Sequence, residues 1–375
     1  MILTEEHQMI RDALRSYAQE RLAPQAARWD KEHYFPKAEL KELAQLGAFG
    51  VAVPEQYGGA GLDYVSLALV LEEIAAGDGG ISTIISVNNC PVCSIAMMYA
   101  NEEQKERFLR PLAQGEMLGA FALTEPHTGS DASALRTTAV REGDDYVING
   151  TKQFITSGKY GDVAIVMAVT DKAAGKKDIS AFWVPIDTPG YIVAGLEQKM
   201  GQHSSDTAQI VFENCRVPAR NLIGEEGMGY KIALSGLEGG RIGIASQSVG
   251  MARAAFEAAL AYAKERESFG KPIFEHQSVQ FRLSEMAMQI EAARQLILHA
   301  ASLKDAGVPC LKEAAMAKLF ASEMAERVVS NAMQVFGGYG YVSDFPIERI
   351  YRDVRVCQIY EGTSDIQKIL IARAL

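Results

Sequence analysis

The sequence predicts a mainly α-helical protein with a small β-domain, a sandwich or barrel, at the centre of the chain. Three observations support this fold class. Helical apolar spacing with capping residues runs to about residue 117, and helical spacing returns from about residue 227 onward. Between them, short β-rich runs alternate with turn residues, without the βαβ repeat of a doubly wound sheet. The predicted domains are residues 1–117, 118–226 and 227–375, and a chain of 375 residues is long enough for two or three domains.

Composition limits the classes of protein and partner. An apolar content of 48% and a charged content of 22% are typical of a soluble globular protein. The net charge of −10 argues against nucleic-acid binding, which needs a basic surface. The apolar run at residues 163–169 is too short for a membrane span, and we expect none elsewhere. Thr4 and the acidic residues after it predict the start of a capped helix rather than a signal peptide.

The five cysteines are sparse and odd in number, which suits a reducing compartment. Cys90 and Cys93 form a CxxC pair, but no second pair and no nearby His is present to complete a zinc site. A redox role is one interpretation of the pair. Two buried apolar cysteines are the other interpretation, which we favour, and we expect no metal site.

Several helices are predicted in the N-terminal part. The first begins after Thr4 and extends to Pro24. The segment Asn88–Asn89–Cys90–Pro91 interrupts a later apolar pattern. Asp63 is positioned to cap an apolar helix that has one face formed by Leu67, Val70, Leu71 and Ile74.

Five short runs are predicted as strands of the central domain. They are Thr137–Arg141, Tyr146–Ile148, Val163–Val169, Ile179–Val184 and Ala208–Phe212. Turn residues such as Asn149–Gly150 and Thr188–Pro189–Gly190 separate them. Short strands with frequent turns indicate a small sandwich or barrel.

The C-terminal part is predicted to contain three long helices and one short one. The first ends at Phe269–Gly270–Lys271–Pro272, a glycine stop followed by proline. The second includes residues 281–296, and the third runs from Leu319 to Val335 and stops at Gly337–Gly338. The last helix is predicted from Asp365 to Leu375.

A carboxylate on a tight turn precedes the last helix. Glu361 is followed by Gly362, which allows the backbone to approach a ligand closely. Thr363 or Ser364 is a candidate N-cap, and Gln367 is positioned to close a capping box from Ser364. Burial would raise the pKa of the Glu361 carboxyl and make it a base near neutral pH. A surface Glu that stabilises the helix N-terminus explains the same spacing.

Two further stretches combine polar and glycine residues. Residues 124–131, Thr-Glu-Pro-His-Thr-Gly-Ser-Asp, form either an anion or carbonyl cradle or an ordinary loop. Gly239 and Gly240 precede Arg241 inside a helical pattern, where each glycine costs about 1 kcal/mol relative to Ala. We interpret these two glycines as making room for a ligand or for a packed helix.

Two more stretches lie at predicted helix ends. Arg266 and Lys271 suit the cations expected at a helix C-terminus. Phe269 beside them instead indicates a site where Arg binds a phosphate and the aromatic ring stacks on a base or on another subunit. Gly337 and Gly338 either end a helix or let the backbone approach a nucleotide. The phosphate-loop, HExxH, GxSxG and strand-linked GxGxxG signatures are absent from the sequence.

Taken in order, these four stretches and the Glu361 turn resemble the acyl-CoA dehydrogenase family over essentially the whole chain. The nearest resemblance is to short-chain or short-branched-chain members, through Ser86–Asn89, Leu237–Arg241 and Gln358–Ile366. The resemblance implies a three-domain fold with an α-helical N-terminal domain, a central β-barrel and a C-terminal four-helix bundle. It also implies that FAD binds between the barrel and the C-terminal helices.

The resemblance assigns roles to individual residues. Glu361 would be the catalytic base; some relatives place a base near Gly239 and Gly240, where glycine cannot act. Segments that would hold the isoalloxazine ring contain Phe121, Leu123, Thr124, Ser130, Phe154 (Trp in many relatives) and Thr156. Residues that would contact the rest of FAD, partly across a subunit boundary, are Arg266, Phe269, Gln277, Gln334, Gly337, Gly338, Thr363 and Asp365. Residues that would contact acyl-CoA are Ser130, Glu238, Arg241 and Gly362.

The implied reaction is FAD-dependent α,β-dehydrogenation of a short or branched acyl-CoA to trans-2-enoyl-CoA, with electrons passed to electron transfer flavoprotein. Such enzymes serve fatty acid β-oxidation and branched-chain amino acid degradation. The implied assembly is a homotetramer, a dimer of dimers, in bacterial cytoplasm or in the mitochondrial matrix after removal of a transit peptide. Two alternatives remain: an oxidase or monooxygenase of the same fold that uses oxygen, and a non-catalytic helical scaffold.

Overall fold

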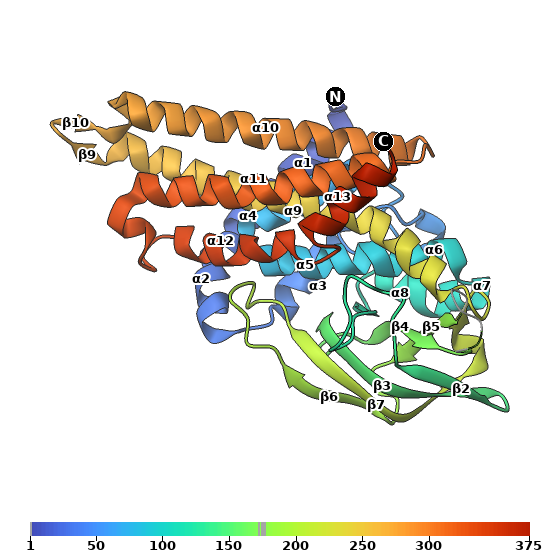
Figure 1. Ribbon diagram of the computed structural model, residues 1–375. Helices are drawn as coiled ribbons and strands as arrows, with labels where there is room; N and C mark the ends of the chain where they lie inside the picture. The colour runs from blue at the N-terminus through green and yellow to red at the C-terminus, as the bar shows by residue number, and fades with distance from the viewer. Residues whose placement is uncertain (1, 172, 174–177) are drawn as a thin grey trace.

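The computed structural model describes residues 2–171, 173 and 178–375. The chain forms a group of helices, then one sheet, then a second group of helices (Figure 1), in the order that the sequence predicts. The sheet lies at one end of the molecule, and the long C-terminal helices extend away from it to the opposite end.

The N-terminal part is helical up to the start of the sheet. Its helices and helical turns are α1 (Glu5–Tyr17), η1 (Ala18–Leu22), α2 (Ala23–Glu32), α3 (Lys37–Gln45), η2 (Glu55–Tyr57), α4 (Tyr64–Gly77), α5 (Gly79–Val87), η3 (Asn88–Cys93), α6 (Ser94–Tyr99), α7 (Glu102–Gln104), η4 (Lys105–Leu109) and α8 (Arg110–Ala113). Thr4 caps α1 and Asp63 caps α4, each by accepting a hydrogen bond from a backbone N–H three residues later. The first helix does not continue to Pro24 as predicted, because the π-helical turn η1 interrupts it. Pro24 then lies in the first turn of α2, where its missing N–H costs nothing.

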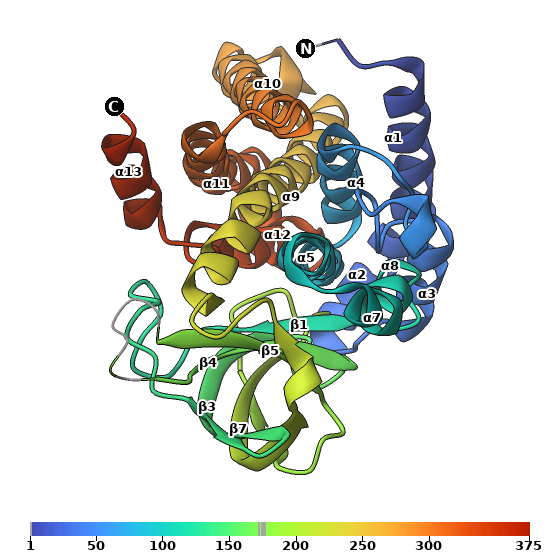
Figure 2. The same ribbon diagram turned by 90° about the vertical axis from the view of Figure 1, so that its right-hand side faces the viewer.

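One correction concerns the segment at residues 79–99. No apolar run of membrane-spanning length was expected from the sequence. The elements α5, η3 and α6 nevertheless join into one helix that, by length and composition alone, is long and apolar enough to cross a membrane. Its most apolar window is 78% buried inside the protein. Figure 2 shows α5 surrounded by α4, α9, α12 and the edge of the sheet, which is the position of a core helix.

Among the described residues, eight strands form a single sheet. They are β1 (Gly119–Ala122), β2 (Thr138–Glu142), β3 (Asp145–Thr156), β4 (Val163–Val169), β5 (Ile179–Pro185), β6 (Tyr191–Leu196), β7 (Thr207–Pro218) and β8 (Leu222–Ile223), with the short turn η6 (Ala219–Asn221) before β8. The strand order is β6-β7-β3-β2-β4-β5-β8, and β1 pairs in parallel with β4. The end strands β6 and β8 do not pair with each other within the described residues, so the predicted barrel is not closed.

Strand β4 shows how the sheet joins the helices. Val163, Ile165 and Met167 pack into a core shared with α6, α8 and the start of α9, whereas the alternate residues of β4 pack against β3 and β7. Both faces of β4 are therefore buried, and its predicted bounds are confirmed. Strands β1, β6 and β8 were not predicted, because β1 and β8 are short and β6 exposes most of its side chains.

The C-terminal part contains α9 (Gly229–Glu265), α10 (Gln277–Asp305), α11 (Leu311–Phe336), α12 (Ile347–Val354) and α13 (Ser364–Arg373). Its short elements are β9 (Glu267–Ser268), β10 (Lys271–Pro272), η7 (Ile273–Glu275), η8 (Gly337–Gly340) and η9 (Arg355–Gln358). The long helices α9, α10 and α11 lie side by side, α12 is a short fourth helix, and α13 packs outside on α11 (Figures 1 and 2). Their core continues into α4, so the two helical parts share one apolar interior.

The end of α9 differs from the prediction. The helix ends at Glu265, not at a glycine stop, and the chain turns back through the β9–β10 hairpin. Phe269 and Gly270 form its two-residue turn, with φ of 53° and 77°. Two left-handed residues are what a tight hairpin of this twist requires.

Candidate active site and cofactor-binding region

Glu361 lies on the turn between η9 and α13, with its carboxylate against helix α9. Backbone φ is 54° at Glu361 and 91° at Gly362, and a non-glycine residue adopts such a conformation only where its surroundings hold it there. A Cβ built on Gly240 of α9 would lie 2.6 Å from the Glu361 Oε2 atom. Gly240 therefore leaves the space that the carboxylate fills. Oε2 is buried and has no hydrogen-bond partner among the residues that the structure describes.

The electrostatic environment of this carboxyl suits proton transfer. Burial raises the pKa of Glu361 to about 7. The positive charges of Arg241 on α9 and Lys318 on α11 act in the opposite direction and lower it. The group therefore exchanges its proton near neutral pH, which a surface glutamate at a helix N-terminus would not do.

The start of α13 differs in detail from the predicted capping box. Thr363 is the N-cap, and its hydroxyl accepts a hydrogen bond from the Ile366 N–H at 3.4 Å. Gln367 makes no box with Ser364; its Nε2 donates to the carbonyl oxygens of Glu361 (3.1 Å) and Gly362 (2.8 Å). The capping-box prediction is wrong because the glutamine amide binds the tight turn before the helix instead. Ser364 Oγ is buried without a partner in the described part of the chain.

Two segments of the sheet come together at the residues expected to hold a flavin ring. The backbone N–H of Gln153 donates to the Thr124 carbonyl at 2.8 Å, so the loop after β1 lies beside the end of β3. This brings the pair Leu123–Thr124 close to the stretch Phe154–Thr156. Phe154 has a φ of 60° and is 61% exposed, which is unusual for a large apolar side chain. Phe121 lies partly buried in β1, and Ser130 lies exposed farther along the loop.

A buried ion pair that the sequence analysis missed anchors this loop. Lys152 of β3 donates from Nζ to Glu125 Oε1 (2.8 Å) and to the Leu123 carbonyl (3.0 Å). The Glu125 carboxylate also accepts hydrogen bonds from the backbone N–H groups of Arg136 and Thr137. Burial raises the pKa of Glu125, but Lys152 and these donors bring it below its ordinary value, so the pair is ionised. Lys152 lies outside the strand predicted at residues 146–148, and the only sequence signal was the β-prone run Phe154–Thr156 that follows it.

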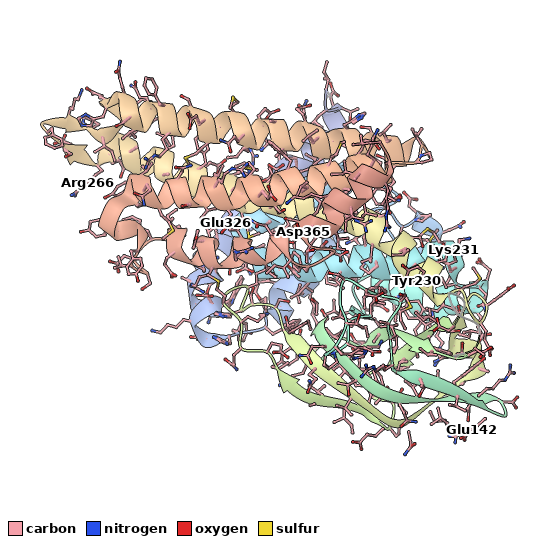
Figure 3. The ribbon with its side chains drawn as sticks, viewed as in Figure 1. Glu142, Tyr230, Lys231, Arg266, Glu326 and Asp365 are labelled. Carbon is pink, nitrogen blue, oxygen red and sulfur yellow. The ribbon has the colours of Figure 1, made fainter. Side chains whose placement is uncertain are left out.

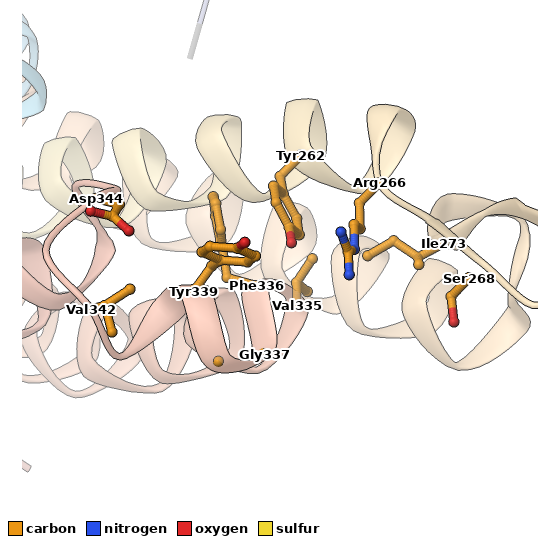
Figure 4. Close-up of a pocket in the computed structure, with 11 residues that line it drawn as sticks. Tyr262, Arg266, Ser268, Ile273, Val335, Phe336, Gly337, Tyr339, Val342 and Asp344 are labelled. Atoms are coloured by element: carbon orange, nitrogen blue, oxygen red, sulfur yellow. The ribbon is translucent and has the colours of Figure 1, made fainter.

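A groove of about 640 Å³ lies at the far end of the helical bundle (Figure 4). Arg266 and Ser268 line one side, and Phe336, Gly337 and Gly338 line the other. A Cβ on Gly337 or Gly338 would meet no described atom within 4 Å, so the backbone there faces open space. The second interpretation of this glycine pair, close backbone approach to a ligand, is geometrically possible.

A second hollow of about 340 Å³ adjoins this groove. Phe269, His276 and Gln334 line it, and Gln277 is the exposed first residue of α10 beside it. Phe269 is 94% exposed at the hairpin tip. The residues expected to contact the cofactor of a neighbouring subunit therefore gather in one region.

The expected cofactor residues form two separate groups in a single chain. Figure 3 shows Arg266 at the hairpin end of the bundle, whereas Asp365 lies near the middle of the molecule at the start of α13. Asp365 is exposed and lies 3.5 Å from Lys368 as an ion pair.

Among the residues expected to contact substrate, Arg241 and Glu238 have different surroundings. Arg241 is 4% exposed, and its Nε and Nη1 have no partner in the described structure. Glu238 pairs with Lys304 at 3.0 Å and accepts a hydrogen bond from the Cys310 thiol at 3.7 Å. Glu238 is therefore engaged within the protein, whereas Arg241 retains unused donors.

Cys90, which lies in the stretch Asn88–Cys93 expected from the sequence to line the acyl pocket, and Tyr64, which was not assigned to the site, close the space beside Glu361. A Cβ on Gly239 would lie 2.9 Å from Cys90 Sγ and 3.2 Å from Tyr64 Cε1. The Tyr64 hydroxyl and the Cys90 sulfur are 3.7 Å apart. Because Tyr64 opens α4 and Gly239 lies 175 positions later, only the folded structure brings them together.

The CxxC pair fits the interpretation as buried apolar residues. Cys90 and Cys93 are both buried and not in a disulfide. Burial raises the pKa of both thiols, which disfavours the reactive thiolate.

Comparison with known proteins places these features in one family. Family models described as the N-terminal, middle and C-terminal domains of acyl-CoA dehydrogenase match residues 4–116, 120–215 and 227–375. The chain is 47% identical over 370 residues to the mitochondrial short-chain specific acyl-CoA dehydrogenase of Rattus norvegicus, covering 99% of this chain and 90% of the relative.

Two solved structures give the same result. Butyryl-CoA dehydrogenase from Megasphaera elsdenii superposes with a TM-score of 0.97 at 42% identity, covering 100% of this chain and 99% of that one. A chain in a structure described as the electron transferring flavoprotein of Acidaminococcus fermentans superposes with a TM-score of 0.98 at 46% identity, covering 100% and 98%.

Proposed function

The chain belongs to the acyl-CoA dehydrogenase family, and we propose that it oxidises short acyl-CoA thioesters with Glu361 as the catalytic base. It is an FAD-dependent oxidoreductase. Glu361 removes the α-proton of the acyl group as a hydride leaves the β-carbon, which gives trans-2-enoyl-CoA. FAD, when bound, supplies the hydride acceptor. The observation that carries the assignment is the buried Oε2 atom, which no described residue hydrogen-bonds and which lies beside Gly240 on a carboxyl that titrates near neutrality.

The residues present fit the proposed cofactor. Arg266 supplies a cation beside a groove whose other wall is the open backbone of Gly337 and Gly338, which suits a phosphate-bearing ligand. Thr363 and Asp365 at the start of α13 would contact the pyrophosphate, close to the buried hydroxyl of Ser364, which has no hydrogen-bond partner among the described residues. The segments at Phe121–Ser130 and Phe154–Thr156 would hold the flavin ring. We propose domain boundaries at 117/118 and 226/227.

A short acyl chain is supported by the closed space beyond Gly240. The reacting carbons must lie against the Glu361 carboxylate, so the acyl tail continues along α9. The missing side chain of Gly239 leaves no free space, because Cys90 and Tyr64 come within 3.4 Å of that position. Gly236 is closed in the same way by Ile95 and Pro91. We propose that the Tyr64 ring ends the acyl pocket. The proposed substrate is a short acyl-CoA whose chain is either linear or branched.

Replacing Tyr64→Leu tests both the reaction and the chain length. Under anaerobic conditions butanoyl-CoA should bleach the flavin absorbance of the purified parent protein, and octanoyl-CoA should do so poorly. In the variant, the kcat/KM for octanoyl-CoA relative to butanoyl-CoA should rise by about tenfold, because a few methylene groups gain space. Tyr57→Leu, which removes a buried tyrosine of the same helical part, is the control. An unchanged ratio in Tyr64→Leu would reject this residue as the end of the pocket, and no bleaching by any acyl-CoA would reject the function.

The assembly is proposed to be a tetramer, a dimer of dimers, in which the hairpin end of one subunit completes the cofactor site of another. The separation of the Arg266 groove from the Asp365 turn supports this proposal, as does the exposed Phe269. Arg266, Phe269 and Gln277 would face the FAD of the neighbouring subunit, and Gln334, Gly337 and Gly338 would form the other side of that shared site. An exposed ring of this size at a hairpin tip fits an interface better than solvent.

Arg266→Ala should release FAD and weaken the oligomer together. We expect at least about a tenfold rise in the apparent Kd for FAD, because a charge-assisted contact to a phosphate is lost. Flavin fluorescence and analytical ultracentrifugation report the two effects. Arg220→Ala, which removes an exposed arginine of the sheet domain, serves as comparison. A variant that keeps both its flavin and its assembly would remove Arg266 from the shared site.

Electron transfer flavoprotein is the proposed electron acceptor, by analogy with the solved relative. Oxygen consumption without an added acceptor would instead identify an oxidase or monooxygenase, and a colourless protein that refuses FAD would identify a scaffold. Bacterial cytoplasm and the mitochondrial matrix are the two proposed locations, and fatty acid β-oxidation and branched-chain degradation are the two proposed pathways.

A further inference from the structure

We propose that Lys318, a lysine buried on α11, is a positioning residue that fixes the Glu361–Gly362 turn and favours the ionised form of the Glu361 carboxyl, which abstracts the proton. This inference rests on the proposed role of Glu361. It concerns a residue that has no place among the expected cofactor or substrate contacts.

Lys318 reaches the catalytic turn directly. Its Nζ atom donates to the Gly362 carbonyl at 2.8 Å, and its side chain is 0% exposed. The same carbonyl accepts a hydrogen bond from Gln367 Nε2 at 2.8 Å, and this amide also donates to the Glu361 carbonyl at 3.1 Å. The Gly362 carbonyl is therefore bound from two helices, α11 and α13, and the Glu361 carbonyl is bound from α13. Such support is what an unfavourable φ at Glu361 requires.

Hydrogen bonding alone does not explain a buried ammonium group here. Gln367 already satisfies the Gly362 carbonyl, and Lys318 has no ion pair within 4.0 Å in the described part of the chain. A buried charge without a partner is costly, and an apolar side chain would avoid that cost. The ammonium group binds the turn that carries Glu361, and its positive charge acts on the Glu361 carboxyl, which gives the buried charge a function.

The groups that face Lys318 come from four elements. They are Glu361 on the turn, Arg241 on α9, Cys357 on η9 and the neutral Gln367 amide on α13. Burial lowers the pKa of Lys318 to about 8, Cys357 and Glu361 act to raise it, and Arg241 acts to lower it. Lys318 therefore stays protonated at neutral pH. Its charge adds to that of Arg241 in opposing the effect of burial on Glu361.

Two substitutions separate the charge from the hydrogen bond. Lys318→Met removes both, whereas Lys318→Gln removes the charge and keeps a donor. In both variants the acid limb of the kcat/KM profile should move to higher pH by about 1 unit, because a neighbouring positive charge no longer favours the carboxylate. Only Lys318→Met should also lower the pH-independent kcat, since only it loosens the turn. Lys312→Met, which removes a more exposed lysine of the same helix, is the matched control and should leave the profile in place.

A second measurement does not depend on turnover. Infrared titration of the protonated carboxyl band, with Glu361→Gln as the blank, gives the titration midpoint of Glu361 in the folded protein with or without FAD. That midpoint should also rise by about 1 unit in both Lys318 variants. A shift of less than about 0.2 unit in a folded variant, against the unit expected, would overturn the inference. If Glu361→Gln itself kept normal turnover, the proposed function would fail, which is a different result from unshifted Lys318 variants.

Discussion

Glu361→Gln should abolish turnover while leaving a yellow, folded enzyme. A glutamine amide fills nearly the same space beside Gly240 but cannot accept the substrate α-proton. We expect kcat to fall by about 10⁴-fold, the upper range for loss of a positioned general base. Dye-linked assay with butanoyl-CoA measures the loss, and the flavin spectrum reports cofactor content. In the parent enzyme, kcat/KM should rise with pH through about 7, because the carboxyl must lose its proton before it acts as a base.

Glu326→Gln provides the matched control. Glu326 is also a partly buried glutamate near the bundle core, where it accepts a hydrogen bond from the Gln358 amide and pairs with Arg355 (Figure 3). Its loss should leave turnover close to that of the parent, since it does not face Gly240. Near-normal activity in Glu361→Gln would remove this residue from the mechanism and leave its raised pKa without a catalytic meaning.

Local signals were enough to predict much of the fold. Thr4 and Asp63 act as helix caps as predicted, because capping depends on residues three positions apart. Strand β4 has its predicted bounds, since an uninterrupted apolar run between turn residues suits a strand buried on both faces. Closure of the sheet was wrongly predicted, because it depends on whether β6 and β8 pair, and neither carries a signal for its partner.

The chemistry around Glu361 was predictable only in part. The turn and its glycine are local, and the resemblance added the role of the base. Gly240, Tyr64 and Lys318 come from three helices far apart in the sequence, and each acts through a contact that no spacing rule contains. The helical glycines were interpreted as space for a ligand or a helix, whereas the space at Gly240 is filled by the carboxylate itself.

Lys152→Met should cause the largest loss of stability. The substitution leaves the Glu125 carboxylate buried without its cation, although two backbone N–H groups still bind it. Removing one partner of a buried ion pair lowers the free energy of unfolding by about 3–5 kcal/mol. Urea denaturation of the FAD-free protein should show a lower midpoint, and the holoenzyme should lose flavin, since the loop that carries Thr124 loses its anchor at the Leu123 carbonyl.

A double substitution separates the ion pair from simple packing loss. Lys152→Met/Glu125→Gln removes both charges, so it should recover part of the stability that Lys152→Met loses, because no uncompensated charge remains buried. Lys159→Met, which removes an exposed lysine of the same domain, should leave the midpoint near that of the parent. If the double variant is no more stable than the single one, the lysine contributes through its aliphatic stem rather than its charge. Recovery of stability without recovery of flavin would mean that the Leu123 hydrogen bond, not the ion pair, holds the loop for the cofactor.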